Sequence, residues 1–222
     1  MSFKSLANKH VISLLALLFV LPYTNANGLD NWHDMSDPQV IFSGVAVSAG
    51  NEGVNIAANY GSYLNSQFKQ KFTVQAVNDL DYYRFDYSAV NLDKNTGFTV
   101  ESAWNRDLWG INGFNDSSLG IFTKVPMGDG KFNFHPKLNL GMMWGGDIKS
   151  TTYIKFDATT RYSFNHKVWA GISPTYTYSM KGIELHKFQV TLDAGLQISP
   201  QFSLAGHINN DDEFWFDVIF TF

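Results

Sequence analysis

The sequence predicts an all-β protein: a closed, antiparallel, up-and-down transmembrane β-barrel of about twelve strands. Three observations favour this fold class. The chain begins with an export segment, and its later segments of about ten residues alternate apolar and polar side chains in one phase. About ten residues is the length that a tilted strand needs to cross a bilayer. The chain also ends on an apolar stripe, where a soluble chain end would fray in water.

Residues 1–26 have the order of a secretory signal peptide. A basic start, MSFKSLANKH, precedes the apolar run VISLLALLFVLP of 12 residues and the small residues TNA. This run is shorter than the roughly 20 residues of a spanning helix, and no later window approaches about 18 uninterrupted apolar residues. We therefore expect a cut after Ala26, and membrane-crossing segments made of strands.

The composition excludes several classes of protein. The net charge is −4, and removal of Lys4 and Lys9 with the signal changes it to −6, so the chain lacks the basic surface that nucleic acid requires. There are no cysteines, which excludes disulfides and thiolate metal sites. Aromatic residues make up 16%, yet the mean hydropathy is only −0.14. A barrel with lipid outside and water inside gives this mixture, although a secreted β-sandwich would give a similar average.

The N-terminal half begins with weak patterns and then becomes regular. Residues 27–38 lack alternation and end at Pro38, so we expect a periplasmic arm there, either a disordered leader or a plug in the lumen. Residues 40–49 and 54–62 are small and contain glycine, which makes them the weakest strands together with 118–125. Three stronger strands, 68–77, 82–91 and 98–105, place Phe72, Val74, Ala76, Tyr83, Phe85, Tyr87, Phe98, Val100 and Trp104 on the outer face.

The C-terminal half alternates almost without interruption. One long connection is expected at residues 106–118, with the sequence RDLWGINGFNDSS. Turn-forming clusters such as PMGDG, GGDIKS and NNDD separate the later segments. The strands expected there are 132–143, 152–164, 168–179, 186–198, 202–209 and 214–222. The count is twelve, and the alternative is ten if the weak segments fail to pair.

The last strand explains how such a sheet would be completed. In hydrocarbon an unpaired strand edge is not tolerated, so the sheet must close and the last strand must pair with the first. An even number of strands then puts both ends of the barrel domain, residues 39–222, on the periplasmic side. Every second residue of the last strand is apolar: Phe214, Phe216, Val218, Phe220 and Phe222.

The signal peptide and the ending FWFDVIFTF together resemble the bacterial outer-membrane β-barrel superfamily. This resemblance implies a location in the outer membrane, contact with its lipid and lipopolysaccharide, and a terminal strand that the barrel-assembly machinery reads. The stretches ELHKFQVTLDAGLQISPQFSLAGHIN and VPMGDGKFNFHPKLNLGM are faintly similar to YfaZ-type outer-membrane proteins, whose activity is undefined. Twelve strands would also suit acidic-oligosaccharide porins of the KdgM type, but their sequence pattern and basic lumen are not reproduced here.

Charged residues concentrate at the alternate strand positions that face the inside of the predicted barrel. A Lys or Arg that faces lipid near the midplane costs about 2–4 kcal/mol, so this distribution indicates a wet or salt-bridged interior. Two interpretations stay open: a selective pore lining, or ion pairs that hold the strands in register. The candidate lumen-lining residues are Lys71, Arg84, Asp86, Glu101, Lys124, Lys137, Lys155, Asp157, Arg161, Asp193, His207 and Asp217.

No pattern of a catalytic or cofactor site is found, and we expect no enzyme. His186 has the outward phase near a loop, but its neighbour on that face is Phe188 rather than a nucleophilic serine. Asp211 and Asp212 are adjacent carboxylates in a hairpin loop, which usually are solvated turn residues. We find no phosphate-binding glycine loop, metal-ligand cluster or nucleophile elbow, and so expect neither cofactor nor metal.

The size of the barrel favours a narrow channel for small solutes. Twelve strands spaced about 4.8 Å apart and tilted by about 40° give a backbone radius of roughly 12 Å. Inward side chains would leave a narrow gap, and Trp169 and Trp215 would narrow it further. The alternative is a structural or adhesive barrel without transport. An outer-membrane lipid hydrolase or protease is a more distant alternative.

Overall fold

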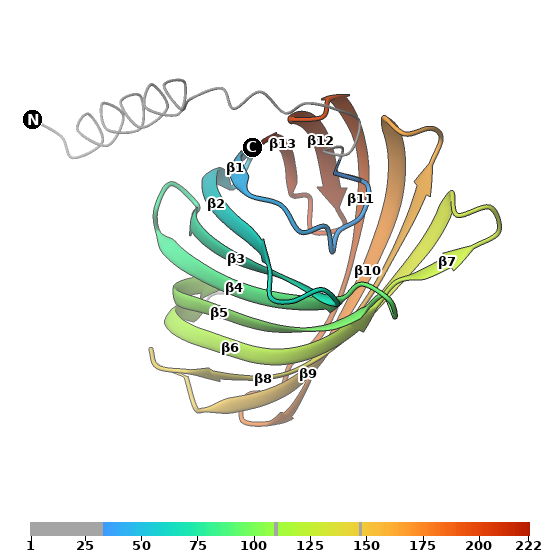
Figure 1. The fold of residues 1–222 in the computed structure, drawn as a ribbon. Coiled ribbons are helices and arrows are strands. Elements are labelled where there is room, and N and C mark those ends of the chain that lie inside the picture. Colours follow the sequence, from blue (N-terminus) through green and yellow to red (C-terminus); the bar gives the residue numbers. More distant parts are fainter. Residues whose placement is uncertain (1–32, 109–110, 147) are drawn as a thin grey trace, which may run out of the picture. The chain divides into compact units, whose positions relative to one another are not determined.

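The computed structural model describes residues 33–108, 111–146 and 148–222, and these form a closed antiparallel β-barrel (Figure 1). Thirteen strands form one sheet in the order β6-β5-β4-β3-β2-β1-β13-β12-β11-β10-β9-β8-β7, and the pairing of β6 with β8 closes it. Because β6 and the short β7 both pair with β8, they occupy one position, and the barrel has twelve positions. Within the described part of the chain, no helix is long and apolar enough to cross a membrane.

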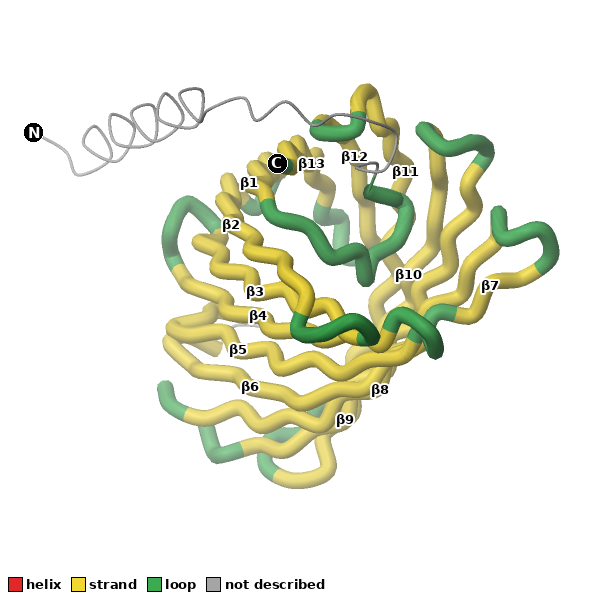
Figure 2. The backbone as a smooth tube through the Cα atoms, in the orientation of Figure 1, coloured by secondary structure: helices red, strands yellow, loops and turns green. Residues whose placement is uncertain are grey.

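Apart from β1, β5, β6 and the short β7, the strand bounds agree closely with the sequence pattern, and the prediction of twelve strands rather than ten is confirmed. The strands are β1 (Gly44–Gly50), β2 (Gly53–Tyr63), β3 (Phe68–Val77), β4 (Tyr82–Asn91), β5 (Thr96–Leu108), β6 (Ile111–Thr123), β7 (Val125–Met127), β8 (Phe132–Trp144), β9 (Thr151–Ser163), β10 (Val168–Lys181), β11 (His186–Ser199), β12 (Phe202–Asn209) and β13 (Phe214–Thr221). Short turns join nearly all of them, as the tube in Figure 2 shows.

The long connection predicted at residues 106–118 is wrong. The strands β5 and β6 continue through this region to Leu108 and from Ile111, so most of it is a hairpin. The β5–β6 register shifts between Ala103 and Arg106 and again before Leu108, and Asn105 has a φ of 61°. Each irregularity resets the alternation of side chains, which is why the sequence pattern does not look like a strand there.

The first strand begins later than predicted, at Gly44 rather than at residue 40. The preceding residues leave the barrel wall: the Lys71 Nζ atom donates a hydrogen bond of 2.8 Å to the Val40 carbonyl, and the Phe42 side chain is buried. The apolar residues 40–42 therefore resemble a strand in sequence, but they precede β1, and Phe42 is buried.

The outer and inner faces differ sharply. The outer face is apolar along each strand, and Phe216, at 64% exposure, and Leu119, at 59%, are typical of it. Buried polar side chains such as Asn139, Gln197 and Thr151 lie on the other face. An outer face with so many exposed apolar side chains would be unstable in water and is typical of a barrel wall with lipid outside.

The first and the last strand, β1 and β13, pair with each other as the sequence predicts. Their antiparallel register runs from Gly44 opposite Thr221 to Gly50 opposite Trp215. Beyond this ladder, the Phe222 N–H donates to the Ser43 carbonyl over 3.0 Å. The chain end is therefore tied into the wall.

Large inward side chains lie over inward glycines of the neighbouring strand. In each case the two residues are direct cross-strand partners, and a Cβ atom on the glycine would collide with the large side chain. Trp169, for example, lies over Gly195 and is only 6% exposed. The five pairs are Gly97 with Phe122, Gly120 with Asn139, Gly141 with Tyr153, Gly171 with Arg161, and Gly195 with Trp169.

Candidate functional site

Three cavities follow one another through the lumen. We call the barrel end that holds Gly44 and Phe222 the proximal end, and the opposite end the distal end. The distal cavity, of about 820 Å³, is lined by turn residues such as Asn51 and Asn78. The middle cavity measures about 260 Å³ and the proximal one about 340 Å³. Because Arg84 lines all three, the cavities meet around this side chain.

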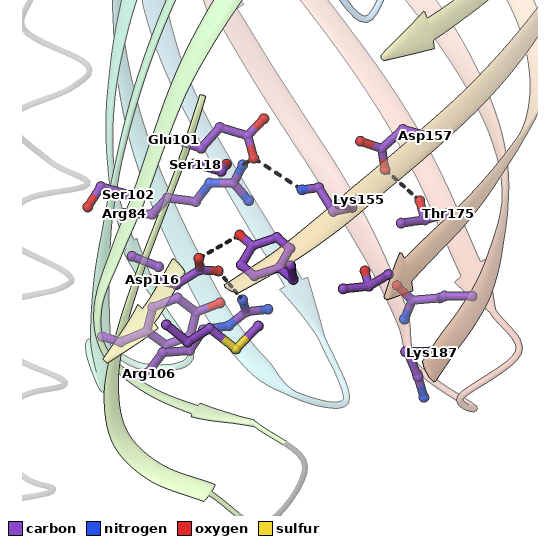
Figure 3. A pocket seen from close by; sticks show the side chains of 16 residues that line it. Arg84, Glu101, Ser102, Arg106, Asp116, Ser118, Lys155, Asp157, Thr175 and Lys187 are labelled. Atoms are coloured by element: carbon purple, nitrogen blue, oxygen red, sulfur yellow. Dashed lines mark hydrogen bonds and ion pairs between the residues drawn. The ribbon is translucent and has the colours of Figure 1, made fainter. Parts of the chain in front are cut away.

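A cluster of alternating charges lies at this meeting point. The Glu101 carboxylate, with a side chain only 12% exposed, accepts hydrogen bonds from Lys137 Nζ at 2.8 Å and Lys155 Nζ at 3.2 Å. The Arg84 Nη2 atom lies 3.3 Å from the same carboxylate. Figure 3 shows Arg84 and Glu101 on one wall of the middle cavity, with Lys155 reaching them from the other.

Two further carboxylates complete what we call the Glu101 cluster. The Arg84 Nε atom donates to Asp86 at 2.9 Å, and Lys137 Nζ lies 3.3 Å from Asp157. The Asp157 carboxylate also accepts the Thr175 hydroxyl at 2.7 Å. The cluster thus holds three cations and three anions, so its charges balance, and it joins strands β4, β5, β8 and β9. The six members are Arg84, Asp86, Glu101, Lys137, Lys155 and Asp157.

Toward the distal end lie residues that the sequence pattern did not single out. Arg106 Nη1 is 3.4 Å from the Asp116 carboxylate, which also accepts the Tyr153 hydroxyl at 2.6 Å. The β-bulges in β5 break the alternation of side chains, so the sequence pattern did not reveal this ion pair. Lys187 Nζ contacts Asp211 at 2.6 Å. Lys187 occupies an inward-facing position of the predicted strand 186–198, so the alternation could have identified it as a lumen residue. Asp211, one of the two adjacent loop carboxylates, therefore belongs to an ion pair.

On the remaining wall one ion pair reaches across strand β10 and another joins two adjacent strands. The Arg161 Nη1 atom lies 2.5 Å from Asp193, whose side chain is 1% exposed. His207 Nε2 lies 3.0 Å from Asp217, and the His207 ring stacks on Trp215 with centroids 4.8 Å apart. These contacts join β9 to β11 and β12 to β13.

Two predicted cations at the proximal end contact the segment before β1. Lys124 Nζ donates to Asp37 at 2.8 Å, and His135 Nδ1 lies 3.6 Å from the same carboxylate. Lys71, besides its bond to the Val40 carbonyl, has its Nζ atom 5.1 Å from the centre of the Phe42 ring. Alternation along strands could not predict partners in a segment that has no alternation.

The twelve candidate lumen residues therefore fall into three groups. Six form the Glu101 cluster, four form the pairs Arg161–Asp193 and His207–Asp217, and Lys71 and Lys124 contact the segment before β1. Of the two tryptophans expected to narrow the lumen, Trp169 has its ring against the wall at Gly195, and Trp215, stacked on His207, lines the distal cavity.

The outer face carries His186 at the start of β11. The His186 ring packs against Tyr178 with centroids 4.9 Å apart, and its Nδ1 atom lies 3.4 Å from the Tyr176 hydroxyl. Among the described residues, no group of three or more His, Asp or Glu side chains could hold a metal ion. The geometry at His186 is that of an aromatic contact.

Comparison with known proteins identifies the fold. No protein-family model matches the chain, and no curated protein sequence matches it. Among solved structures, the NanC porin is similar with a TM-score of 0.56 and 8% identity, over 81% of this chain and 98% of that one. The KdgM porin in complex with disordered oligogalacturonate is similar with a TM-score of 0.56 and 7% identity, over 82% of this chain and 99% of that one. A second KdgM porin structure is similar with a TM-score of 0.54 and 8% identity, again over 82% of this chain and 99% of that one. The chain therefore has the fold of the small outer-membrane β-barrel porins.

Proposed function

We propose that this chain is a channel of the bacterial outer membrane that lets small polar solutes cross. The row of polar cavities that meet at Arg84, inside a closed barrel with an apolar outer face, is the observation that supports this function most directly. The polar linings would replace part of a solute's hydration with hydrogen bonds.

The membrane location follows from the outer face. Residues 1–26 act as the export signal, and the barrel-assembly machinery reads the terminal stripe from Phe214 to Phe222. The exposed aromatic and aliphatic side chains then contact outer-membrane lipid and lipopolysaccharide. The proximal end, where the barrel begins and ends, faces the periplasm. The similarity to YfaZ-type proteins stays a prediction.

The balanced charges argue for weak selectivity. In the Glu101 cluster three cations face three carboxylates, so a passing ion of either sign meets groups that attract it and groups that repel it. The KdgM porin was solved with oligogalacturonate, an acidic oligosaccharide. Because the cluster has no excess of positive charge, we propose small solutes of either sign or none as the substrates of this chain.

Conductance in planar bilayers tests this function. We expect small, reproducible current steps whose size and ion preference change when Lys155 and Arg161 are both replaced by glutamine. The matched control is Lys94→Gln, in an exposed turn between β4 and β5. If the protein carries no current, with or without residues 27–38, the channel is refuted and a structural or adhesive barrel is the better description.

A further inference from the structure

Residues 33–43, which we call the N-terminal segment, run inside the ring of strands before β1 begins (Figure 2). At one end the Ser43 hydroxyl and the Gly61 backbone of β2 are joined by contacts of 3.0 and 3.2 Å. At the other end the Ser36 hydroxyl lies 3.1 Å from the Ser163 hydroxyl of β9. In a ring of twelve positions, β2 and β9 are six apart. The N-terminal segment therefore spans the lumen from one wall to the opposite wall.

Polar contacts hold the middle of the N-terminal segment. Asp37 lies between Lys124 Nζ at 2.8 Å and His135 Nδ1 at 3.6 Å. The Gln39 side-chain amide donates to the Thr123 carbonyl at 3.3 Å, and Lys71 donates to Val40. Each of these partners belongs to the barrel, and they come from different sides of the lumen.

The barrel wall is shaped to receive the N-terminal segment. The side chains of Ser36 and Phe42 are buried. A Cβ atom at Gly61 would lie 2.8 Å from the carbonyl carbon and oxygen of Phe42, so only glycine leaves room for this approach. Pro38 and Gln39 line the proximal cavity.

We propose that the N-terminal segment is a plug that closes the proximal end of the lumen, and that Asp37 is the residue that fastens it. Solutes pass when the plug leaves its contacts with Lys124 and His135. This inference rests on the proposed channel function, and the experiments below are chosen so that either one can fail separately.

The first experiment weakens or removes the plug. Loss of a hydrogen bond between charged groups corresponds to a change of about tenfold in an equilibrium, so Asp37→Asn is expected to raise the ratio of open to closed time by about that factor. Deletion of residues 33–39 is expected to keep the channel open. Asp129→Asn is the matched control, because it removes the same charge from an exposed proximal turn. Variants that conduct like the unchanged protein would overturn the plug but not the channel.

The second experiment locks the plug. The chain has no cysteine, so Ser36→Cys with Ser163→Cys places one thiol pair where two hydroxyls now lie 3.1 Å apart. Oxidation is expected to form a disulfide and suppress the current, and reduction is expected to restore it. The two single variants are the controls and should not respond. Failure to form the disulfide, or an oxidised form that conducts like the reduced one, would overturn the plug.

Thiol labelling separates failure of the plug from failure of the channel. Ser173 lines the proximal cavity, behind the plug, so Ser173→Cys reports access from the proximal side in lipid vesicles. Deletion of residues 33–39 should speed its reaction with a water-soluble thiol reagent added on that side. Faster labelling without any current would refute the channel and support the plug. Labelling at an unchanged rate would overturn the plug whatever the current.

Discussion

Replacement of Glu101 by glutamine should test the central ion cluster most sharply. Glutamine keeps the size of the side chain and removes its charge. Lys155 then loses its carboxylate, and Glu101 is the only carboxylate within ion-pair distance of Lys155 among the described residues. Lys137 keeps Asp157 at 3.3 Å, and Arg84 keeps Asp86 at 2.9 Å.

These remaining partners limit the expected loss of stability. Removing one partner of a buried ion pair costs about 3–5 kcal/mol, because the other charge is left unpaired. A hydrogen bond to a charged group contributes about 1.5–3 kcal/mol. Arg84 contributes little here, because its side chain is 39% exposed and its charge is screened. We therefore expect Glu101→Gln to lower the free energy of unfolding by about 2–3 kcal/mol, mostly through the unpaired Lys155.

Urea unfolding of the protein in phospholipid vesicles, followed by tryptophan fluorescence, measures this loss. The double variant Glu101→Gln with Lys155→Met should lose less than Glu101→Gln alone, because no buried ammonium is then left without a partner. Glu184→Gln is the matched control, since that side chain is exposed in the β10–β11 turn. The same Glu101 variant leaves three cations against two carboxylates, so the reversal potential in a salt gradient should shift toward anion preference.

Two results would refute this reasoning. A change in unfolding free energy below about 0.5 kcal/mol, the range of ordinary surface substitutions, would show that the cluster does not stabilise the barrel. A reversal potential that stays the same would show that ions do not pass the cluster.

Three further predictions concern other parts of the wall. Leu119→Arg on the outer face should cost about 2–4 kcal/mol in urea unfolding from lipid vesicles, and a loss no greater than that of Leu119→Ala would contradict a lipid-facing position. Asp193→Asn should cost about 3–5 kcal/mol in the same assay, because it leaves Arg161 without its partner at 2.5 Å; an unchanged unfolding midpoint would contradict this. Deletion of Phe222 should reduce the amount of inserted protein in cells while the purified protein keeps its urea midpoint, and normal insertion would show that the terminal residue is not part of the assembly signal.

The sequence was sufficient to predict the strands wherever the alternation runs unbroken. From Phe188 in β11 and throughout β12 the outward residues are apolar or glycine, and both strands lie within one residue of the predicted bounds. The hairpin of β5 and β6 was missed because a bulge inverts the phase: Arg106 faces inward although its even number, in the phase of β5, predicts an outward side chain. A shift in register depends on the neighbouring strand and leaves no periodic trace in one sequence.

The candidate site was predictable only in part. Side-chain phase assigned Glu101, Lys137 and Lys155 to the inner face, but their meeting depends on how far β5, β8 and β9 are offset. Asp37 could not be found in this way, because it precedes the first strand and its partners Lys124 and His135 are distant in sequence. Alternation gives the face of each residue, and only the closed barrel gives its partner.

The glycines opposite large inward residues have a consequence for how such a pore can change. A ring or guanidinium that packs against a glycine lies nearer to the wall than a larger residue at that position would allow, as Trp169 does at Gly195 and Arg161 at Gly171. The width of the passage then depends on these glycines, whereas its charge depends on residues such as Glu101 and Lys155. A single methyl group added at Gly195 would push the Trp169 ring away from the wall without altering any charge. Aperture and ion preference can therefore be varied one at a time, in evolution or by design.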